Sequence, residues 1–433
     1  LEAFHALARI EAEGAFAKFI GKSETNDARD ARFVTELVSG VTRMQKLMDY
    51  YIFKLYKGDM EEMQDSVRRC LRMGLYELTQ MDTPPHAALN EYAELARYAI
   101  NERVVGLING MLRTASRWDT PPEPDIDNTA ERLAVAYSHP TWLVRKWLTR
   151  WGQLKTTDIL RHNNERPTFG VRPNAIHADA ETFDERAKEA GFESEPSKWV
   201  DGMVTAQSVQ PLVRSGLLND GLCSVQDEAA ALVVHLINLK PGETLFDVCA
   251  APGGKTCYAA ERSGNKATIV ASDVSRNRTR LVERSAKRLG LSSVETVEAS
   301  VADRAKSRQE ADAVLLDVPC SGTGVLGKRA DMRWHRTPAE LDELRVLQIQ
   351  MLKDAAKLVK PGGRLIYATC SLEAEENERQ VTRFLKKNPD FELRSAAGRV
   401  PDDMVTREGY YSALPHEHGT DGAFAAILVR SGG

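Results

Sequence analysis

The fold of this chain is decided by the stretch Leu245-Phe246-Asp247-Val248-Cys249-Ala250-Ala251-Pro252-Gly253-Gly254-Lys255-Thr256. Its first five residues form a short apolar run of the kind found in buried strands. The small residues that follow let the backbone approach a ligand closely, and the helix expected after them would present free N–H groups at its start. The stretch therefore predicts a strand, a tight turn and a helix, with a ligand at the turn.

Helices and apolar strands alternate on both sides of this stretch. Strands are expected at Ala267–Ser272, Ala313–Leu316 and Leu365–Ala368, and Pro361-Gly362-Gly363 is expected to end the helix before the last of them. Continuous apolar strands that alternate with helices are typical of a doubly wound sheet. We therefore expect a Rossmann-like α/β domain over residues 226–433, with ligands at the carboxyl ends of its strands.

The turn after the first strand matches neither common nucleotide-binding motif, because it lacks the G-x-G-x-x-G spacing and the first glycine of a phosphate-binding loop. Asp273 ends the next strand, 26 residues after Asp247, where an acid typically binds the ribose hydroxyls of an adenosine-containing cofactor. Asp303 follows in a loop and could lie near the adenine amine. The alternatives are a turn without a ligand, a helix-capping Asp273 and a solvated Asp303. The turn and Asp273 together favour an adenosine cofactor.

Two cysteines follow strands of the same predicted sheet. Cys320 lies in the turn Asp317-Val318-Pro319-Cys320-Ser321-Gly322-Thr323-Gly324, and Cys370 lies in Thr369-Cys370-Ser371-Leu372. A single cysteine is usually structural, but two at strand ends indicate a paired-thiol site. A thiolate that adds to carbon 6 of a cytosine makes carbon 5 nucleophilic towards a methyl sulfonium, and a second cysteine or a nearby acid can assist removal of the carbon 5 proton. Asp317 is placed to contact the cytosine or the methyl donor. Position and spacing leave open which thiol attacks.

The sequence before this domain predicts two further structural units, a helical bundle and a small α+β module. The first 126 residues have apolar side chains at spacings of three and four, as at Val67 and Cys70, which predicts a compact helical bundle. A proline-rich, acidic linker at Thr120–Asp127 marks its end. Residues 127–225 are expected to form a small α+β module, with a candidate strand at Thr168–Arg172.

Composition is typical of a soluble protein of a reducing compartment. The 433 residues carry a net charge of −4, with 42% hydrophobic and 28% charged residues. This balance excludes a uniform affinity for nucleic acid and permits a local basic surface. No apolar run is long enough to cross a bilayer, and six cysteines without a C-x-x-C pair predict neither a disulfide framework nor a metal site. We expect a cytoplasmic protein.

The chain resembles the RNA cytosine-C5 methyltransferases in three stretches, Asp247–Thr256, Asp317–Gly324 and Ala368–Ser371, the last followed by Glu375-Glu376-Asn377-Glu378. The stretches are long and occur in the family's order. The resemblance implies an enzyme that uses S-adenosylmethionine, in which Cys370 attacks the base and Cys320 helps to release the product. The cofactor contacts that it implies are Cys249, Ala250, Ala251, Pro252, Gly253, Gly254, Lys255, Asp273, Asp303 and Asp317.

The N-terminal helices are similar to a NusB-type RNA-binding domain at Asp30–Val41, Pro84–Glu91 and Gly106–Arg113. With that domain present, the chain most resembles the bacterial family B methyltransferases of small-subunit (16S) ribosomal RNA, in which the α+β module is RRM-like. The resemblance implies methylation of ribosomal RNA. We separately expect a monomer. The same chemistry on transfer RNA or large-subunit ribosomal RNA is the alternative within this class. The alternative from another class is an inactive RNA-binding assembly factor, against which the intact motifs argue.

The segment after the Pro-Cys turn departs from the family pattern. The family has a basic residue and then His-Pro before an acid, where this chain has Lys328-Arg329-Ala330-Asp331. Arg333 and Arg336 follow, with Trp334 between them. We expect either a surface that binds phosphates and stacks on bases or a solvated charged loop.

Overall fold

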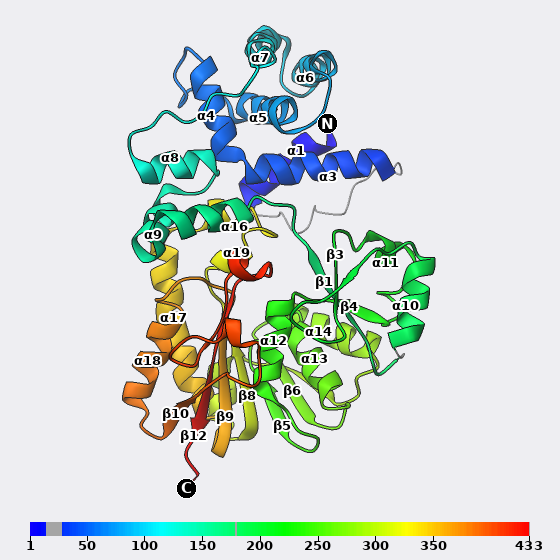
Figure 1. Ribbon diagram of the computed structural model, residues 1–433, viewed down its shortest axis with the longest axis vertical. Helices are drawn as coiled ribbons and strands as arrows, with labels where there is room; N and C mark the ends of the chain where they lie inside the picture. The colour runs from blue at the N-terminus through cyan, green and yellow to red at the C-terminus, as the bar shows by residue number, and fades with distance from the viewer. Residues whose placement is uncertain (14–27, 178–179, 433) are drawn as a thin grey trace. The chain divides into compact units, whose positions relative to one another are not determined.

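The computed structural model describes residues 1–13, 28–177 and 180–432. The chain divides into two compact units (Figure 1). The first comprises Leu1–Glu165 together with Leu326–Arg336, and the second comprises Arg166–Val325 and Thr337–Gly433. The division of the sequence at residues 126 and 225 stays a prediction.

The described part of the first unit consists of helices and connecting loops. Its helices are α1 (Glu2–Glu13), α3 (Ala28–Arg43), α4 (Gln45–Leu55), α5 (Asp65–Gln80), α6 (Pro85–Ala99), α7 (Glu102–Ala115), α8 (Thr129–Ala136), α9 (Thr141–His162) and α16 (Met332–His335). The three-and-four spacing buries Val67, Cys70 and Leu71 in one core with side chains of the neighbouring helices, which confirms the predicted bundle.

The second unit contains a small antiparallel sheet in the order β2-β3-β1-β4. Its elements are β1 (Phe169–Pro173), α10 (Ala180–Glu189), β2 (Glu195–Pro196), β3 (Val204–Ala206), α11 (Gln210–Arg214) and β4 (Cys223–Val225). The strand predicted at Thr168–Arg172 is β1. The expected α+β character of this module is confirmed.

An eight-stranded sheet forms the rest of the second unit, in the order β10-β12-β9-β8-β5-β6-β7, with β11 beside β12. Its strands are β5 (Thr244–Asp247), β6 (Thr268–Asp273), β7 (Val294–Glu298), β8 (Ala311–Asp317), β9 (Val359–Thr369), β10 (Phe391–Arg394), β11 (Tyr411–Ala413) and β12 (Ala423–Arg430). Helix α12 (Glu228–Ile237) precedes these strands, and the helices between them are α13 (Gly254–Arg262), α14 (Arg276–Arg288), α15 (Val301–Lys306), α17 (Pro338–Ala356), α18 (Glu378–Lys387) and α19 (Pro415–His418). Strands β5 to β9 pair in parallel, and β12 is antiparallel to β9.

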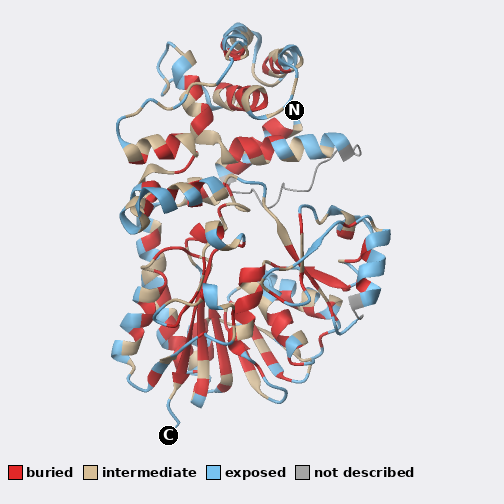
Figure 2. Cartoon of the chain, in the orientation of Figure 1, coloured by how far each residue is buried: buried red, intermediate tan, exposed pale blue. Residues whose placement is uncertain are grey.

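The sheet confirms the predicted α/β fold and differs from the prediction at β7 and at Pro361-Gly362-Gly363; strands β10 and β11 were not predicted either. Figure 2 shows buried residues concentrated along its central strands, as expected for a sheet covered on both faces. Strand β7 was not predicted, because at the edge of the parallel part its residues are only partly buried and lack an apolar run. The prediction that Pro361-Gly362-Gly363 ends a helix was wrong, since α17 ends at Ala356 and these residues lie within β9.

The small sheet is attached to the helix that follows the glycine-rich turn. Arg172 of β1 donates a hydrogen bond to Glu261 of α13 at 2.8 Å, and both side chains are almost fully buried. The guanidinium also lies 4.3 Å from the centre of the Tyr258 ring. Burial raises the pKa of Glu261 to about 7. A buried ion pair of this kind constrains the orientation of both elements, because breaking it would leave a charge uncompensated.

Candidate active site

The glycine-rich turn joins β5 to α13 at the carboxyl edge of the large sheet. Gly253 has a φ of 104°, in the left-handed region, and a Cβ at this position would lie 3.1 Å from the Cα of Val282. Glycine is required there on both grounds. The turn thus brings backbone against α14 and leaves its inner side lined by small residues.

Asp247 ends β5 with its side chain inside the protein. Thr256 donates its hydroxyl to Oδ2 of Asp247 at 2.6 Å, whereas Oδ1 has no hydrogen-bond partner within the described residues. Burial raises the pKa of Asp247 to about 7, with a further contribution from Asp317. An unpaired carboxylate oxygen beside a glycine turn is suited to a polar or cationic group of a ligand.

Lys255 and Asp317 form an ion pair between the turn and the end of β8. The Lys255 Nζ lies 2.7 Å from Oδ2 of Asp317. Burial alone would lower the pKa of Lys255, but Asp317 and then Cys370 outweigh it, so this pKa is raised. The ammonium group is therefore held charged next to the Cys370 side chain.

The two remaining predicted cofactor acids lie in different surroundings. Asp273, at the end of β6, is 4% exposed, accepts the Ala251 N–H at 3.3 Å and pairs with Arg278 at 3.0 Å. Asp303, on α15, has a side chain 60% exposed and pairs with Lys306 at 3.0 Å. The structure thus joins Asp273 to the glycine-rich turn and leaves Asp303 at the surface. The predicted cofactor role of Asp303 stays a prediction.

The two predicted thiols meet at the ends of neighbouring strands. Asp317 and Ala368 are partners in the parallel register of β8 and β9, so the turns that follow these strands lie together. The Sγ atoms of Cys320 and Cys370 are 3.3 Å apart. Contact with Cys370, followed by burial, raises the pKa of Cys320 well above its usual range. At neutral pH Cys320 is therefore a protonated thiol.

Sequence reasoning gave no individual role to Glu376 and did not consider Gln348. Both side chains are fully buried beneath the two cysteine turns. The Gln348 amide donates to Oε1 of Glu376 at 2.9 Å. The only sequence signal was the acidic run at 375–378 within the family motif, and it does not show which of these residues points inward.

Neither alternative for residues 328–336, a basic surface or a solvated loop, holds for Arg333, which is buried; for the partly buried Trp334 the base-stacking role stays a prediction. Arg333 is 1% exposed inside the first unit, where it donates to the carbonyl oxygens of Ser138 at 3.0 Å and Asn163 at 3.1 Å. The Trp334 indole N–H donates to the carbonyl oxygen of Thr42 at 2.6 Å. A guanidinium has five donors in a planar fork, so it can satisfy backbone carbonyls as well as phosphates, and sequence does not distinguish the two.

The turns at the carboxyl edge of the large sheet carry residues that fit S-adenosylmethionine, the methyl donor implied by the sequence. The small-residue turn, the unpaired oxygen of Asp247 and the acid at the end of β6 are suited to an amino-acid and ribose-bearing ligand. Within the described residues, no group of three or more His, Cys, Asp or Glu side chains could hold a metal ion. No described helix is long and apolar enough to span a membrane.

Comparisons with known proteins agree with this arrangement over the whole chain. Family models match in three places: NusB at residues 1–117, the ferredoxin-like domain of RsmF/B-like methyltransferases at 139–211, and 16S rRNA methyltransferase RsmB/F at 234–429. The probable ribosomal RNA small subunit methyltransferase B of Bacillus subtilis is 32% identical, over 99% of this chain and 98% of the relative. The corresponding protein of Synechocystis sp. is 34% identical, over 93% of this chain and 92% of the relative.

Solved structures show the same similarity. The crystal structure of PH0851 is 30% identical with a TM-score of 0.82, over 99% of this chain and 96% of that one. A methyltransferase homologue from Pyrococcus horikoshii is 25% identical with a TM-score of 0.61, over 70% of this chain and all of the other. On its near full-length similarity and the order of its three matched parts, the chain belongs to the RsmB/F family and is an S-adenosylmethionine-dependent rRNA methyltransferase.

Proposed function

We propose that this enzyme methylates carbon 5 of a cytosine in small-subunit (16S) ribosomal RNA through a covalent bond between Cys370 and carbon 6. The observation that carries the proposal is the 3.3 Å separation of the Cys320 and Cys370 sulfur atoms at the edge of the sheet that also bears the cofactor turn. We further propose that Cys249 to Lys255, Asp273, Asp303 and Asp317 contact the cofactor. We expect the protein to act as a cytoplasmic monomer.

The charges around the two thiols support Cys370 as the nucleophile. Lys255 interacts with Cys370, and an ammonium group favours a thiolate over a thiol. Cys320 instead has Cys370, Glu376 and Asp317 around it, all of which disfavour its ionisation. We therefore assign Cys370 as the nucleophile, and its thiolate adds to carbon 6 of the cytosine.

Addition of Cys370 places electron density on carbon 5, and S-adenosylmethionine supplies the electrophilic methyl group that carbon 5 takes up. The proton on carbon 5 must then leave before Cys370 can be expelled. Once Cys370 is a neutral thioether, the contact that most raises the pKa of Cys320 is gone. Cys320 can then lose its own proton to solvent and accept the proton of carbon 5. The electrons of that C–H bond expel Cys370 as a thiolate, so one proton is released in each turnover.

Two variants test the assignment of the thiols. Cys370→Ala is expected to abolish methyl transfer and form no adduct, whereas Cys320→Ala is expected to accumulate a covalent protein–RNA adduct. Incubation with unmodified 16S ribosomal RNA and S-adenosylmethionine, followed by a denaturing gel, distinguishes these results. An adduct formed by Cys370→Ala and not by Cys320→Ala would reverse the assignment.

The RNA target is tested in cells. Bisulfite sequencing of small-subunit, large-subunit and transfer RNA, from cells with and without the protein, is expected to show one 5-methylcytosine lost from 16S ribosomal RNA. Loss of a methylated cytosine from either of the other two RNA classes would replace the proposed substrate. No loss in any of them would favour the assembly factor.

A further inference from the structure

A buried carboxylate joins the two cysteine turns. Glu376 is fully buried, and its Oε1 accepts the backbone N–H of Ser321 at 2.9 Å. Its Oε2 accepts the hydroxyl groups of Ser321 and Ser371. Ser321 directly follows Cys320 and Ser371 directly follows Cys370, so one side chain holds the residue next to each thiol.

A second buried side chain extends this connection to the other side of Cys320. The Gln348 Nε2, on α17, donates to Oε1 of Glu376 at 2.9 Å and to the carbonyl oxygen of Pro319 at 3.0 Å. Cys320 is thus held at the residue before it and at the residue after it. We refer to Glu376, Gln348, Ser321 and Ser371 as the thiol clamp.

The clamp also sets the charge beside the thiols. The four donors that reach Glu376 are an amide N–H, two hydroxyls and a side-chain amide, and all of them are uncharged. After Cys370 and burial, Glu376 also raises the pKa of Cys320. The same residue therefore restrains the geometry of both turns and helps to keep Cys320 protonated.

We propose that Glu376 is a positioning residue for the methyl-transfer reaction, which holds the two thiols in contact and places its own carboxyl group next to Cys320. This inference rests on the proposed cysteine chemistry. Because Glu376 lies beneath the turns and is fully buried, it acts through Ser321 and Ser371 and touches neither RNA nor cofactor.

Loss of the thiol clamp is expected to lower the rate of the chemical step and to leave the affinity for the cofactor unchanged. Glu376→Ala should lower kcat by about 100-fold, the cost typical of a misplacement of about 1 Å in a reacting group. The Kd for S-adenosylmethionine, measured by isothermal titration calorimetry, should be unchanged. The covalent protein–RNA adduct should be resolved more slowly, because release of Cys370 depends on Cys320. Denaturing gels of samples taken over time measure this. Glu343→Gln is the matched control, since Glu343 is exposed on α17, the helix that carries Gln348.

The Glu376→Gln variant removes the negative charge of the thiol clamp and retains its hydrogen bonds. Glutamine can still accept the Ser321 N–H and hydrogen-bond both hydroxyls, so the fold should be retained. In a Cys370→Ala background, removal of the negative charge should move the alkylation of Cys320 by iodoacetamide to lower pH, as followed by mass spectrometry of the Cys320 peptide. Glu343→Gln in the same background should leave this pH profile unchanged. The alkylation profile of Cys320 does not require enzyme activity. It therefore tests the role of Glu376 even if the Glu376→Ala variant does not fold.

The outcomes distinguish the two proposals. If the Cys320 and Cys370 variants behave as expected but Glu376→Ala turns over at the wild-type rate, or Glu376→Gln leaves the alkylation profile of Cys320 unmoved, the role of Glu376 is wrong and the cysteine chemistry stands. Equal loss of cofactor affinity and kcat in Glu376→Ala would indicate general disruption and would also overturn the inference. If Cys370→Ala still methylates RNA, the proposed function itself fails.

Discussion

The backbone N–H of Gly324 donates a hydrogen bond to the carbonyl oxygen of Cys370 at 3.0 Å. The Pro-Cys turn therefore lies directly against the Thr-Cys-Ser turn through main-chain atoms. A Cβ on Gly324 would come within 2.7 Å of the Gly422 carbonyl oxygen and 2.8 Å of the Cys370 carbonyl oxygen. The close approach leaves no room for any side chain.

We predict that Gly324→Ala separates the two cysteine turns. Because the obstructing atoms belong to the backbone, the turns must shift, and kcat should fall by about 100-fold. The free energy of unfolding should decrease by about 1–3 kcal/mol, as is usual for overpacking. Gly327→Ala is the control, since the nearest atom to its Cβ is 3.9 Å away. Equal activity of the two variants in a methyl-transfer assay would contradict this prediction.

Lys255→Met is predicted to slow methyl transfer. The substitution removes the ammonium group that pairs with Asp317 at 2.7 Å and interacts with Cys370, so the site loses the positive charge beside the nucleophile. At neutral pH the rate should fall by about 10- to 100-fold. Lys266→Met, at an exposed position, provides the comparison. A rate of methyl transfer equal to that of Lys266→Met would contradict this prediction.

Asp247 is predicted to make folding stability dependent on pH. Burial raises its pKa from 3.8 to about 7, so between these values the folded state holds more protons than the unfolded state. Stability then falls as pH rises, by about 4 kcal/mol at pH 8 for this group alone. Asp247→Asn lacks this penalty and should be stabilised relative to the wild type at pH 8 but not at pH 4. Urea unfolding at both pH values measures the difference. Glu261 titrates in the same range but is common to both proteins, so the comparison isolates Asp247.

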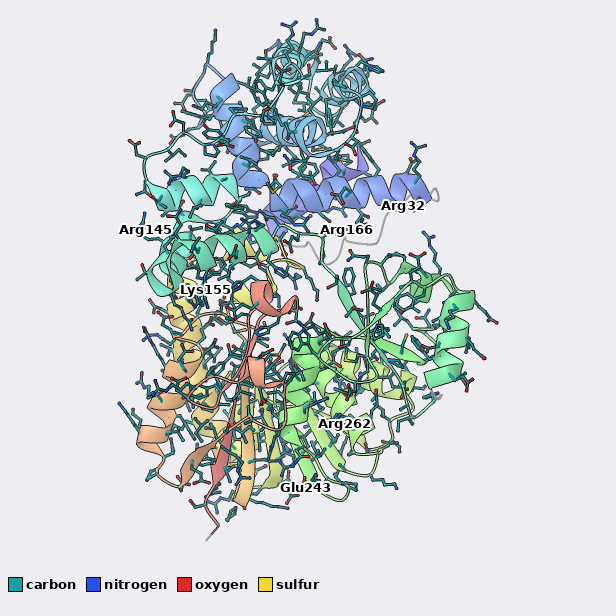
Figure 3. The ribbon with its side chains drawn as sticks, viewed as in Figure 1. Arg32, Arg145, Lys155, Arg166, Glu243 and Arg262 are labelled. Atoms are coloured by element: carbon teal, nitrogen blue, oxygen red, sulfur yellow. The ribbon has the colours of Figure 1, made fainter. Side chains whose placement is uncertain are left out.

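Arg333→Met is predicted to destabilise the first unit by about 2–4 kcal/mol, because it leaves buried carbonyl oxygens without donors. Those oxygens belong to Ser138, Asn163 and Leu326, and the side-chain oxygen of Asn164 also loses its bond. Thermal unfolding should show the loss, and hydrogen exchange should become faster at residues 326–336. The control is Arg32→Met, at an exposed position on α3 (Figure 3). Unchanged exchange at residues 326–336 would show that Arg333 does not hold this segment.

Local sequence determined the main elements of the catalytic domain and where its chemistry lies. The apolar runs at β5, β6, β8 and β9 and the glycine-rich turn after β5 are properties of short segments, so their period and composition predict them directly. Since the carboxyl ends of parallel strands share one edge, the positions of Cys320 and Cys370 after two such strands predicted their proximity. The edge strand β7 escaped prediction because partial burial removes the apolar signal.

Only the tertiary structure decided how those groups are held and charged. Cys320 and Cys370 are 50 residues apart in the chain, and Glu376 and Ser321 are 55 apart, so no local pattern specifies their contacts. Arg333 and Ser138 are 195 residues apart, and their hydrogen bond makes a basic segment part of a buried core. The burial of Asp273 and the exposure of Asp303 are likewise set by which segments pack around them. Burial and hydrogen bonding depend on which segments pack together, and that is set by the whole fold and not by the residues on either side.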